Sequence, residues 1–266
     1  MEFTASPARS LKLAIAEHAR VIHALMLRDI KTRMGGSYFG FLLGLILPLG
    51  HIGVILAIYV FLGRRAPIGN DVLLFLASGI LPFIIWSYTH QKIILSFSQN
   101  SPLTSFPIVK TIDIPIARAL VEFLNSTIIV CVVLSTLAIL DVDLFFQNPH
   151  ILLFSGFLAY MLGVSTGLTF GILSRLSLAL SMLGFLLIPL FWVASGTLFI
   201  PDSLPEAGRT AVSFFALAHI VDLSRTALFP SYISSFPSLV FVSCAIIGNL
   251  LFSIIAIQKF KVGAQR

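Results

Sequence analysis

Six long apolar stretches, separated by shorter polar segments, fill the chain between residues 38 and 257. They are Tyr38–Leu62, Val72–Leu95, Ile116–Leu140, Ile151–Ser174, Ser177–Ile200 and Ser238–Ile257. Each stretch supplies the roughly 20 helical residues that cross a hydrocarbon core of about 30 Å. Because a helix satisfies its own backbone hydrogen bonds, it is the structure that lipid favours. The pattern predicts an all-α integral membrane protein with six transmembrane helices.

Residues 1–37 precede the first span and are expected to form a cytosolic N-terminus, followed by a transmembrane domain over 38–266. Within the N-terminus, Ser10–Met34 has an apolar and a polar side at helical spacing. The apolar side carries Leu11, Ile15, Ala19, Ile22, Met26 and Ile30, and the polar side carries Glu17, Arg20, Arg28 and Lys31. A basic amphipathic helix before a span is typical of one that lies in the membrane interface. A solvated cytosolic helix is the alternative.

The connections between the apolar stretches differ in length. A long inner connection covers residues 96–115 and contains three prolines, whereas a long outer one covers 201–237. The outer one includes Ala211–Leu228, which is too short and too polar for a full crossing. We interpret it as outer re-entrant helices between spans five and six, covered by protein. Arg175 alone interrupts the apolar run 151–200 and predicts a tight hairpin.

Composition and charge agree with this topology. The chain is 58% hydrophobic and 11% charged, whereas soluble domains carry about 25% charged residues. With the N-terminus inside, thirteen of the 17 basic residues lie on the inner side, all except Arg64, Arg65, Arg209 and Arg225. This positive-inside bias predicts that both termini are cytoplasmic. The net charge of +6 therefore indicates topology and no nucleic-acid partner.

The two cysteines, Cys131 and Cys244, lie inside predicted spans. This placement disfavours a disulfide framework or a zinc site and indicates buried apolar packing.

One motif suggests a nucleophile. Residues 163–167 read Gly-Val-Ser-Thr-Gly, but the G-x-S-x-G elbow requires a strand, a turn and a helix, and this match lies in mid-span. An intramembrane serine protease needs a histidine at matching depth, and the sequence places none beside Ser165. The same residues continue to Gly171 as a stripe of small residues, which favours close helix packing. Gly36, Gly40 and Gly44 form a second stripe of this kind.

Other signals of catalysis or of ion coupling are missing. No lysine follows a glycine, so there is no Walker-type phosphate loop, and no histidine precedes a glutamate, so there is no H-E-x-x-H site. The centres of the spans also lack the acidic residues that proton-driven carriers use. We expect a transport subunit that is not itself an enzyme and that receives energy from another subunit. The inner segment 96–115, with an aromatic residue and prolines, is a candidate docking element; a passive connector is the alternative.

The ordered set of motifs resembles the permease subunits of ABC exporters for capsular polysaccharide in Gram-negative bacteria. The similar segments are LRDIKTR (27–33), FLASGILPF (75–83), PIVKTID (107–113), ARALVE (117–122), AHIVDLSR (218–225) and PSYIS (230–234). Together they cover nearly the whole chain in the expected order.

The resemblance implies a homodimeric, multi-pass permease of the bacterial inner membrane with two cytosolic ATPase subunits. The chain itself is expected to bind no cofactor and no metal, because ATP and Mg²⁺ belong to the ATPase. The expected substrate is a lipid-linked polysaccharide, passed towards periplasmic and outer-membrane export proteins. A permease of the same fold for O-antigen, teichoic-acid-like polymers or small molecules is an alternative, and an intramembrane serine hydrolase is a more distant one.

These expectations give four groups of candidate residues. The ATPase-coupling group is Ser98, Phe106, Pro107, Lys110 and Asp113. The N-terminal helix, which we expect to brace the inner mouth, contributes Arg28, Asp29, Lys31 and Arg33. Candidate channel residues, offering stacking surfaces and positive charge to a sugar polymer, are Arg64, Arg65, Phe83, Trp86, Tyr88, Phe191 and Trp192. A candidate outer gate has three residues at i, i+3 and i+6, namely His219, Asp222 and Arg225.

Overall fold

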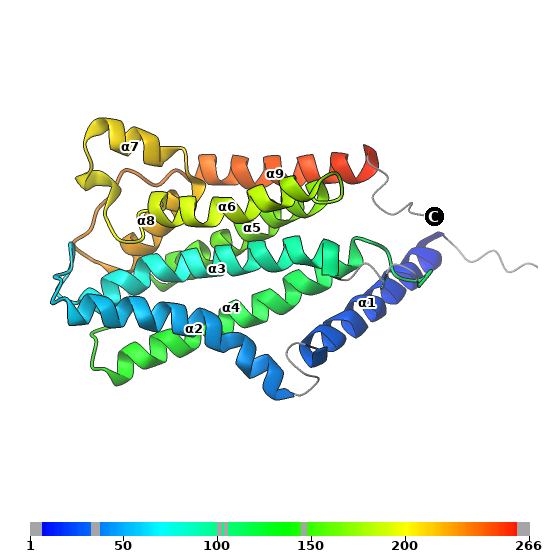
Figure 1. The fold of residues 1–266 in the computed structure, drawn as a ribbon, viewed down its shortest axis with the longest axis horizontal. Coiled ribbons are helices and arrows are strands. Elements are labelled where there is room, and N and C mark those ends of the chain that lie inside the picture. Colours follow the sequence, from blue (N-terminus) through cyan, green and yellow to red (C-terminus); the bar gives the residue numbers. More distant parts are fainter. Residues whose placement is uncertain (1–6, 33–37, 100–102, 104–105, 145–147, 260–266) are drawn as a thin grey trace, which may run out of the picture.

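The computed structural model describes residues 7–32, 38–99, 103, 106–144 and 148–259, in which helices run lengthwise through a bundle (Figure 1). The first helices are α1 (Pro7–Thr32), α2 (Tyr38–Phe61), α3 (Val72–Gln99), α4 (Asp113–Ile139) and α5 (Pro149–Leu173). They are followed by α6 (Leu178–Ala194), the short 3₁₀ helix η2 (Pro201–Ser203), α7 (Glu206–Ser213), α8 (Ala216–Leu228) and α9 (Leu239–Lys259). Arg33, one of the candidate residues, lies outside the described residues.

The prediction of an all-α membrane protein is confirmed, and each apolar stretch contains one helix. Among the described residues, α2, α3, α4, α5 and α9 are long and apolar enough to cross a membrane. The helix α6 has 17 residues, about 26 Å, and ends before the predicted boundary at Ile200. Gly196, with φ of 71°, follows its C-cap and stops it in the left-handed conformation that glycine favours. The predicted hairpin at Arg175 is also confirmed, because α5 ends at Leu173 and α6 begins at Leu178.

The central helix is α3. Its spanning window is 83% buried, whereas that of α2 is 17% buried. The helix α5 lies directly against it because the glycine stripe has no side chains: a Cβ built at Gly163 would lie 2.8 Å from the Trp86 carbonyl oxygen, and one at Gly167 would lie 2.9 Å from Ile93 Cβ. The stripe is therefore a packing surface, as the sequence indicated.

One packing expectation finds no support within this chain, and another is wrong. Gly44, the described end of the second glycine stripe, has no atom within 4 Å of a built Cβ, because α2 lies at the periphery. Cys131 and Cys244, expected to be buried, are both exposed. In lipid an apolar residue is as stable on the outside of a bundle as inside it, so location in a span does not imply burial.

The bundle has two distinct ends (Figure 1). One end, here the α1 end, contains α1, residues 106–112 and the turn 174–177. The opposite end, here the α8 end, contains the loop 62–71, η2, α7, α8 and the segment 229–238.

The predicted re-entrant region is built from α7 and α8, which are bent by 104° relative to one another. The helix α6 ends and α9 begins at the α8 end, so the segment between them enters and leaves the bundle on the same side (Figure 1). Most residues of α8 are buried against α3 and α5. This cover by protein is the condition under which lipid tolerates such a helix.

The contact between α3 and α5 can be tested with a matched pair of variants. Gly163→Ala places a methyl group against the Trp86 backbone, and we expect it to lower the free energy of unfolding by about 1–3 kcal/mol. Gly248→Ala on α9 is the control, since a Cβ there meets no atom within 4 Å and alanine favours the helix. Thermal unfolding of the purified protein in detergent measures both. Equal stability of the two variants would contradict the close approach.

Candidate functional site

At the α1 end, polar contacts hold residues 106–113 against α1. Lys110 Nζ donates to His18 Nε2 over 2.8 Å, and His18 Nδ1 lies 3.5 Å from Asp113 Oδ1. The other Asp113 oxygen accepts the backbone N–H of Lys110 over 2.9 Å. The structure therefore brings together two predicted coupling residues, Lys110 and Asp113, and adds His18, which the sequence did not single out.

A second contact ties α1 to α4. Asp29 and Arg118 form an ion pair of 2.9 Å, and their side chains are only 14% and 11% exposed. Burial strengthens such a pair relative to one in water. Two other candidates on α1, Arg28 and Lys31, are exposed. Asp29 therefore fixes the helix, while its basic neighbours face outward.

The predicted apolar side of α1 is only partly the packed side. Ile15 is 60% exposed and Ala19 is exposed, whereas Ile22 and Met26 are half-buried. The helix is rotated so that its polar residues His18 and Asp29 reach α4 and the segment before it. Ion pairing, which a hydrophobic pattern does not contain, sets this orientation.

Just before these anchored residues, the segment 106–108 presents apolar side chains to its surroundings. Phe106 is 58% exposed and Ile108 is 65% exposed, and Pro107 between them is exposed as well. Ser98 belongs to α3, and its side chain lies outside the described residues. An apolar surface held rigidly at the end of a bundle is suited to bind another protein.

Four of the candidate channel aromatics pack against one another between α3 and α6. The Phe83 and Trp192 rings are 4.6 Å apart, as are those of Trp86 and Phe191, and Phe83 and Trp86 are buried. Within one subunit these rings hold α6 on α3. Tyr88 is half-buried and no ring contact joins it to this cluster among the described residues. Contact of these aromatics with a sugar polymer stays a prediction.

At the α8 end, His219 and Asp222 attach α8 to segments on either side of it. His219 Nε2 bonds the Ser213 carbonyl at the end of α7 over 2.9 Å, and Nδ1 lies 3.0 Å from the Phe236 carbonyl oxygen. Tyr232 donates to Asp222 over 2.6 Å. Burial, and after it the hydrogen bond and charge of Asp222, raise the pKa of Tyr232, so the phenol keeps the proton that it donates.

Arg225 is fully buried and attaches α8 to the turn after α6. Its guanidinium donates to the Phe199 carbonyl over 2.7 Å and to the Thr197 carbonyl over 3.0 Å. It also lies 4.5 Å from the centre of the Phe75 ring on α3, a favourable cation–π distance. Gly79 makes room for this turn, since a Cβ there would lie 2.6 Å from the Thr197 carbonyl oxygen.

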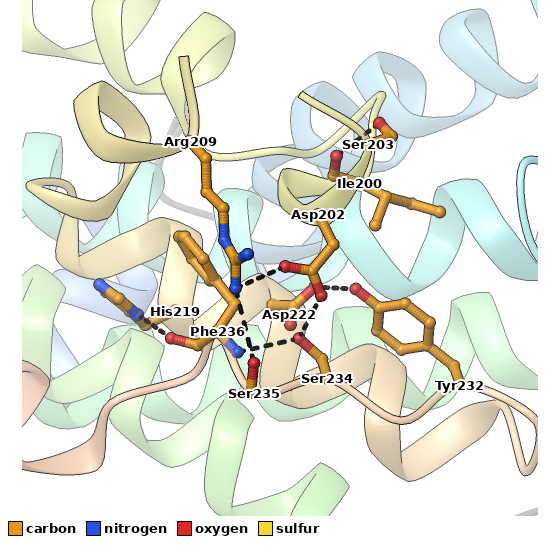
Figure 2. A network of polar contacts seen from close by, with 10 residues as sticks. All are labelled: Ile200, Asp202, Ser203, Arg209, His219, Asp222, Tyr232, Ser234, Ser235 and Phe236. Carbon is orange, nitrogen blue, oxygen red and sulfur yellow. Dashed lines mark hydrogen bonds and ion pairs between the residues drawn. The ribbon is translucent and has the colours of Figure 1, made fainter. Parts of the chain in front are cut away.

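Figure 2 shows the polar network that continues from these residues towards the surface. Asp202 pairs with Arg209 over 2.9 Å and accepts a hydrogen bond from Ser234 over 3.1 Å. The network joins η2, α7 and the segment 229–238 above α8. Arg64 and Arg65, the remaining channel candidates, are exposed in the loop 62–71 at the same end. His219 and Asp222 thus both contact the segment 229–238, His219 also contacts the end of α7, and Arg225 contacts the turn after α6. Their role as a gate stays a prediction.

Sequence reasoning missed His90, a buried histidine of α3. Its Nδ1 lies 2.9 Å from Thr166 Oγ1 on α5, its Nε2 lies 3.0 Å from the Gly184 carbonyl oxygen on α6, and its ring stacks on Trp86. A single imidazole therefore joins three helices. The sequence does show a single histidine in the apolar stretch Val72–Leu95. Such a residue indicates a polar contact but does not identify its partners.

The structure gives no support to a serine nucleophile. Ser165 is buried, and its hydroxyl donates to the Leu162 carbonyl of its own helix over 3.1 Å. His90 contacts the neighbouring Thr166 instead. Within the described part of the chain, no group of three histidine, cysteine or acidic residues is placed to hold a metal ion.

The anchoring role of Arg225 gives a stability prediction. Lysine cannot reach two carbonyls as the planar guanidinium does, so Arg225→Lys should lower the free energy of unfolding by about 1.5–3 kcal/mol. Arg209→Lys is the control at a half-exposed ion pair, where we expect less than about 1 kcal/mol. Thermal unfolding reports both, and equal shifts would show that the buried arginine does not anchor α8.

Comparison with known proteins gives a consistent result. No protein-family model matches the chain. It is 30% identical over 223 residues to the polysialic acid transport protein KpsM of Escherichia coli, covering 82% of this chain and 84% of that protein. It is also 23% identical to the capsule polysaccharide export inner-membrane protein BexB of Haemophilus influenzae, covering 96% and 97%. The corresponding protein CtrC of Neisseria meningitidis serogroup B is 25% identical, covering 95% of each chain.

KpsM is a polysialic acid transport protein, and BexB and CtrC are capsule polysaccharide export proteins of the inner membrane. These functions favour the first interpretation of the sequence over a serine hydrolase or a small-molecule exporter. The similarity to KpsM extends over most of both chains. The apolar helices of the bundle are those expected of a membrane protein. The chain therefore belongs to the family of multi-pass inner-membrane permease proteins of capsular-polysaccharide export.

Proposed function

We propose that this chain is the permease subunit of an ATP-driven exporter that passes lipid-linked capsular polysaccharide across the inner membrane. In this assembly two copies of the chain pair with two cytosolic ATPase subunits, which bind ATP and Mg²⁺. Periplasmic and outer-membrane export proteins receive the polymer. The names and functions of the relatives support the substrate class.

The distribution of charge supports a cytosolic location for the α1 end. Lys31, Lys110, Arg118, Arg175 and Lys259 belong to elements at this end, where α1 and α4 begin or end and where α5 turns into α6. The opposite end has fewer, namely the exposed Arg64 and Arg65, the half-buried Arg209 and the buried Arg225. Basic residues concentrate on the cytosolic side of membrane proteins.

The observation that carries the proposal is the anchored apolar surface of residues 106–108. Aromatic and aliphatic side chains that are exposed on a rigid support are the usual anchors of protein interfaces. An ATPase bound at Phe106 and Ile108 would push on a segment that Lys110 and Asp113 connect to α1. The Asp29–Arg118 ion pair then carries the same displacement from α1 into α4. A motion of the ATPase thus has a short physical route to a membrane-spanning helix.

The proposal is tested by placing a charge on this surface. Phe106→Asp should reduce co-purification of the ATPase subunit by about tenfold or more, because a buried interface aromatic contributes about 2 kcal/mol. Surface polysaccharide, measured on cells that carry the variant, should fall with it. The matched control is Ile233→Asp, a 93% exposed residue at the α8 end, which should leave ATPase binding unchanged.

Two results would count against this assignment, namely full ATPase binding by the Phe106 variant and loss of binding in the Ile233 control. The yield and melting temperature of each variant show whether it folds, so that a folding defect is not mistaken for loss of the interface.

A further inference from the structure

A half-open cavity of about 350 Å³ lies between α3, α4 and α5, with α8 behind it. Its lining is mainly aliphatic and aromatic and includes Leu81, Ile85, Phe123, Val130 and Leu153. Phe123 is 45% exposed and Leu153 is 73% exposed, so the cavity opens on the outer surface of the bundle. That surface faces lipid in a protein whose α3, α4 and α5 cross the membrane.

The length and position of the cavity match one leaflet of a bilayer. Its lining runs from Leu74 to Ile85 on α3 and from Phe123 to Leu134 on α4, about 16 Å along each helix. Half of a hydrocarbon core is about 15 Å. Leu74 lies in the first turn of α3 and Leu152 in the first turn of α5, so the cavity begins at the α8 end and reaches the middle of the membrane.

One buried polar group in the cavity has no partner among the described residues. Ser224 of α8 is 1% exposed, its side chain lines the cavity, and its hydroxyl bonds to no described residue. The hydroxyls of Ser78, Ser155 and Thr127, which also line it, each donate to a carbonyl of their own helix. A buried hydroxyl without a partner costs free energy.

We propose that this cavity binds one acyl chain of a phospholipid from the leaflet at the α8 end, and that Ser224 donates a hydrogen bond to an ester carbonyl oxygen of that lipid. A pocket open to lipid is filled by acyl chains, because a void would forfeit the dispersion contacts of its lining. The ester lies at the outer end of the chain. Ser224 lies there too, since its neighbour Arg225 packs over Phe75 in the first turn of α3. The bound chain then forms part of the packing between α4 and α5.

The proposal is tested with the full-length protein in nanodiscs that contain a phosphatidylglycerol with a diazirine in the middle of one acyl chain. After irradiation and digestion, mass spectrometry locates the labelled residues. We expect labelling of residues 123–134 and 152–160 to exceed that of the exposed face of α9 by about tenfold, as a site with a gain of about 1.4 kcal/mol over bulk lipid requires. The α9 face includes Cys244 and serves as the internal reference for simple lipid exposure.

Two glycines provide a matched pair of variants. A Cβ at Gly156 in the cavity lining meets only Ile85 Cδ1, at 3.9 Å, so Gly156→Leu fills the cavity without a backbone clash. It should lower labelling of the cavity about tenfold. Gly248→Leu on α9, where a Cβ meets nothing within 4 Å, should leave the labelling of the cavity unchanged. Ser224→Ala, which changes no packing, should weaken labelling about fivefold through loss of one hydrogen bond, and it carries the test if Gly156→Leu does not fold.

Three results would overturn the proposal. Equal labelling of the cavity and of the α9 face would show that the cavity does not bind lipid specifically. Cavity labelling that neither Gly156→Leu nor Ser224→Ala reduces would show that the lipid binds elsewhere. Extraction of the purified protein that yields only a lipid-linked glycan in place of phospholipid would assign the cavity to the exported substrate.

Discussion

The helix α5 can lie against α3 because three of its residues, at helical spacing, have no side chain. At Gly163 and Gly167 even a methyl group would meet the backbone or Cβ atoms of α3. Close approach of backbones is the chief source of attraction between helices in lipid, where the hydrophobic effect no longer favours association. The other helices are arranged around this pair. α4 and α8 pack on α3, α8 and α9 pack on α5, and α6 contacts both.

Polar side chains then fix what the glycines bring together. His90 connects α3 to α5 and α6, and Arg225 connects α8 to the turn after α6. In each case a partner is a main-chain carbonyl group. Those of Thr197 and Phe199 lie outside the helices, and that of Gly184 lies within α6. In a medium without water such bonds have few competitors. They make the positions of α6 and α8 specific, whereas dispersion alone would allow the helices to slide.

Hydropathy alone was sufficient to predict the helices, because every crossing requires about 20 apolar residues. The spacing of the glycines likewise predicted close packing of residues 163–171 against another helix, but did not identify α3 as that helix. The short semi-apolar piece at 211–228 predicted the re-entrant pair. Which side of each helix is buried could not be predicted. Lipid and core are both apolar, so Cys131 and Cys244 face outward although they lie in apolar spans.

The polar contacts at the α1 end were easier to predict from the sequence than those of His90 and Arg225. Lys110, Asp113 and Asp29 stand out as charges beside an apolar span, and the structure places them in contacts between α1 and α4. The partners of Arg225 are backbone oxygens, which carry no sequence signal, and those of His90 lie 76 and 94 residues away in the chain. The orientation of α1 goes with the contacts of His18 and Asp29 to residues far along the chain, and it leaves Ile15 exposed.

The buried guanidinium of Arg225 also constrains the order in which the molecule is assembled. An arginine placed alone at the centre of a membrane costs about 2.5–3.5 kcal/mol or more, and α8 carries Asp222 as well. The carbonyls and the ring that receive Arg225 belong to residues 75–199, which leave the ribosome before α8 does. When α8 is synthesised, the residues that contact Arg225 have therefore already been made. When α9 is inserted, the guanidinium already has the carbonyl and ring partners that hold it in the folded protein.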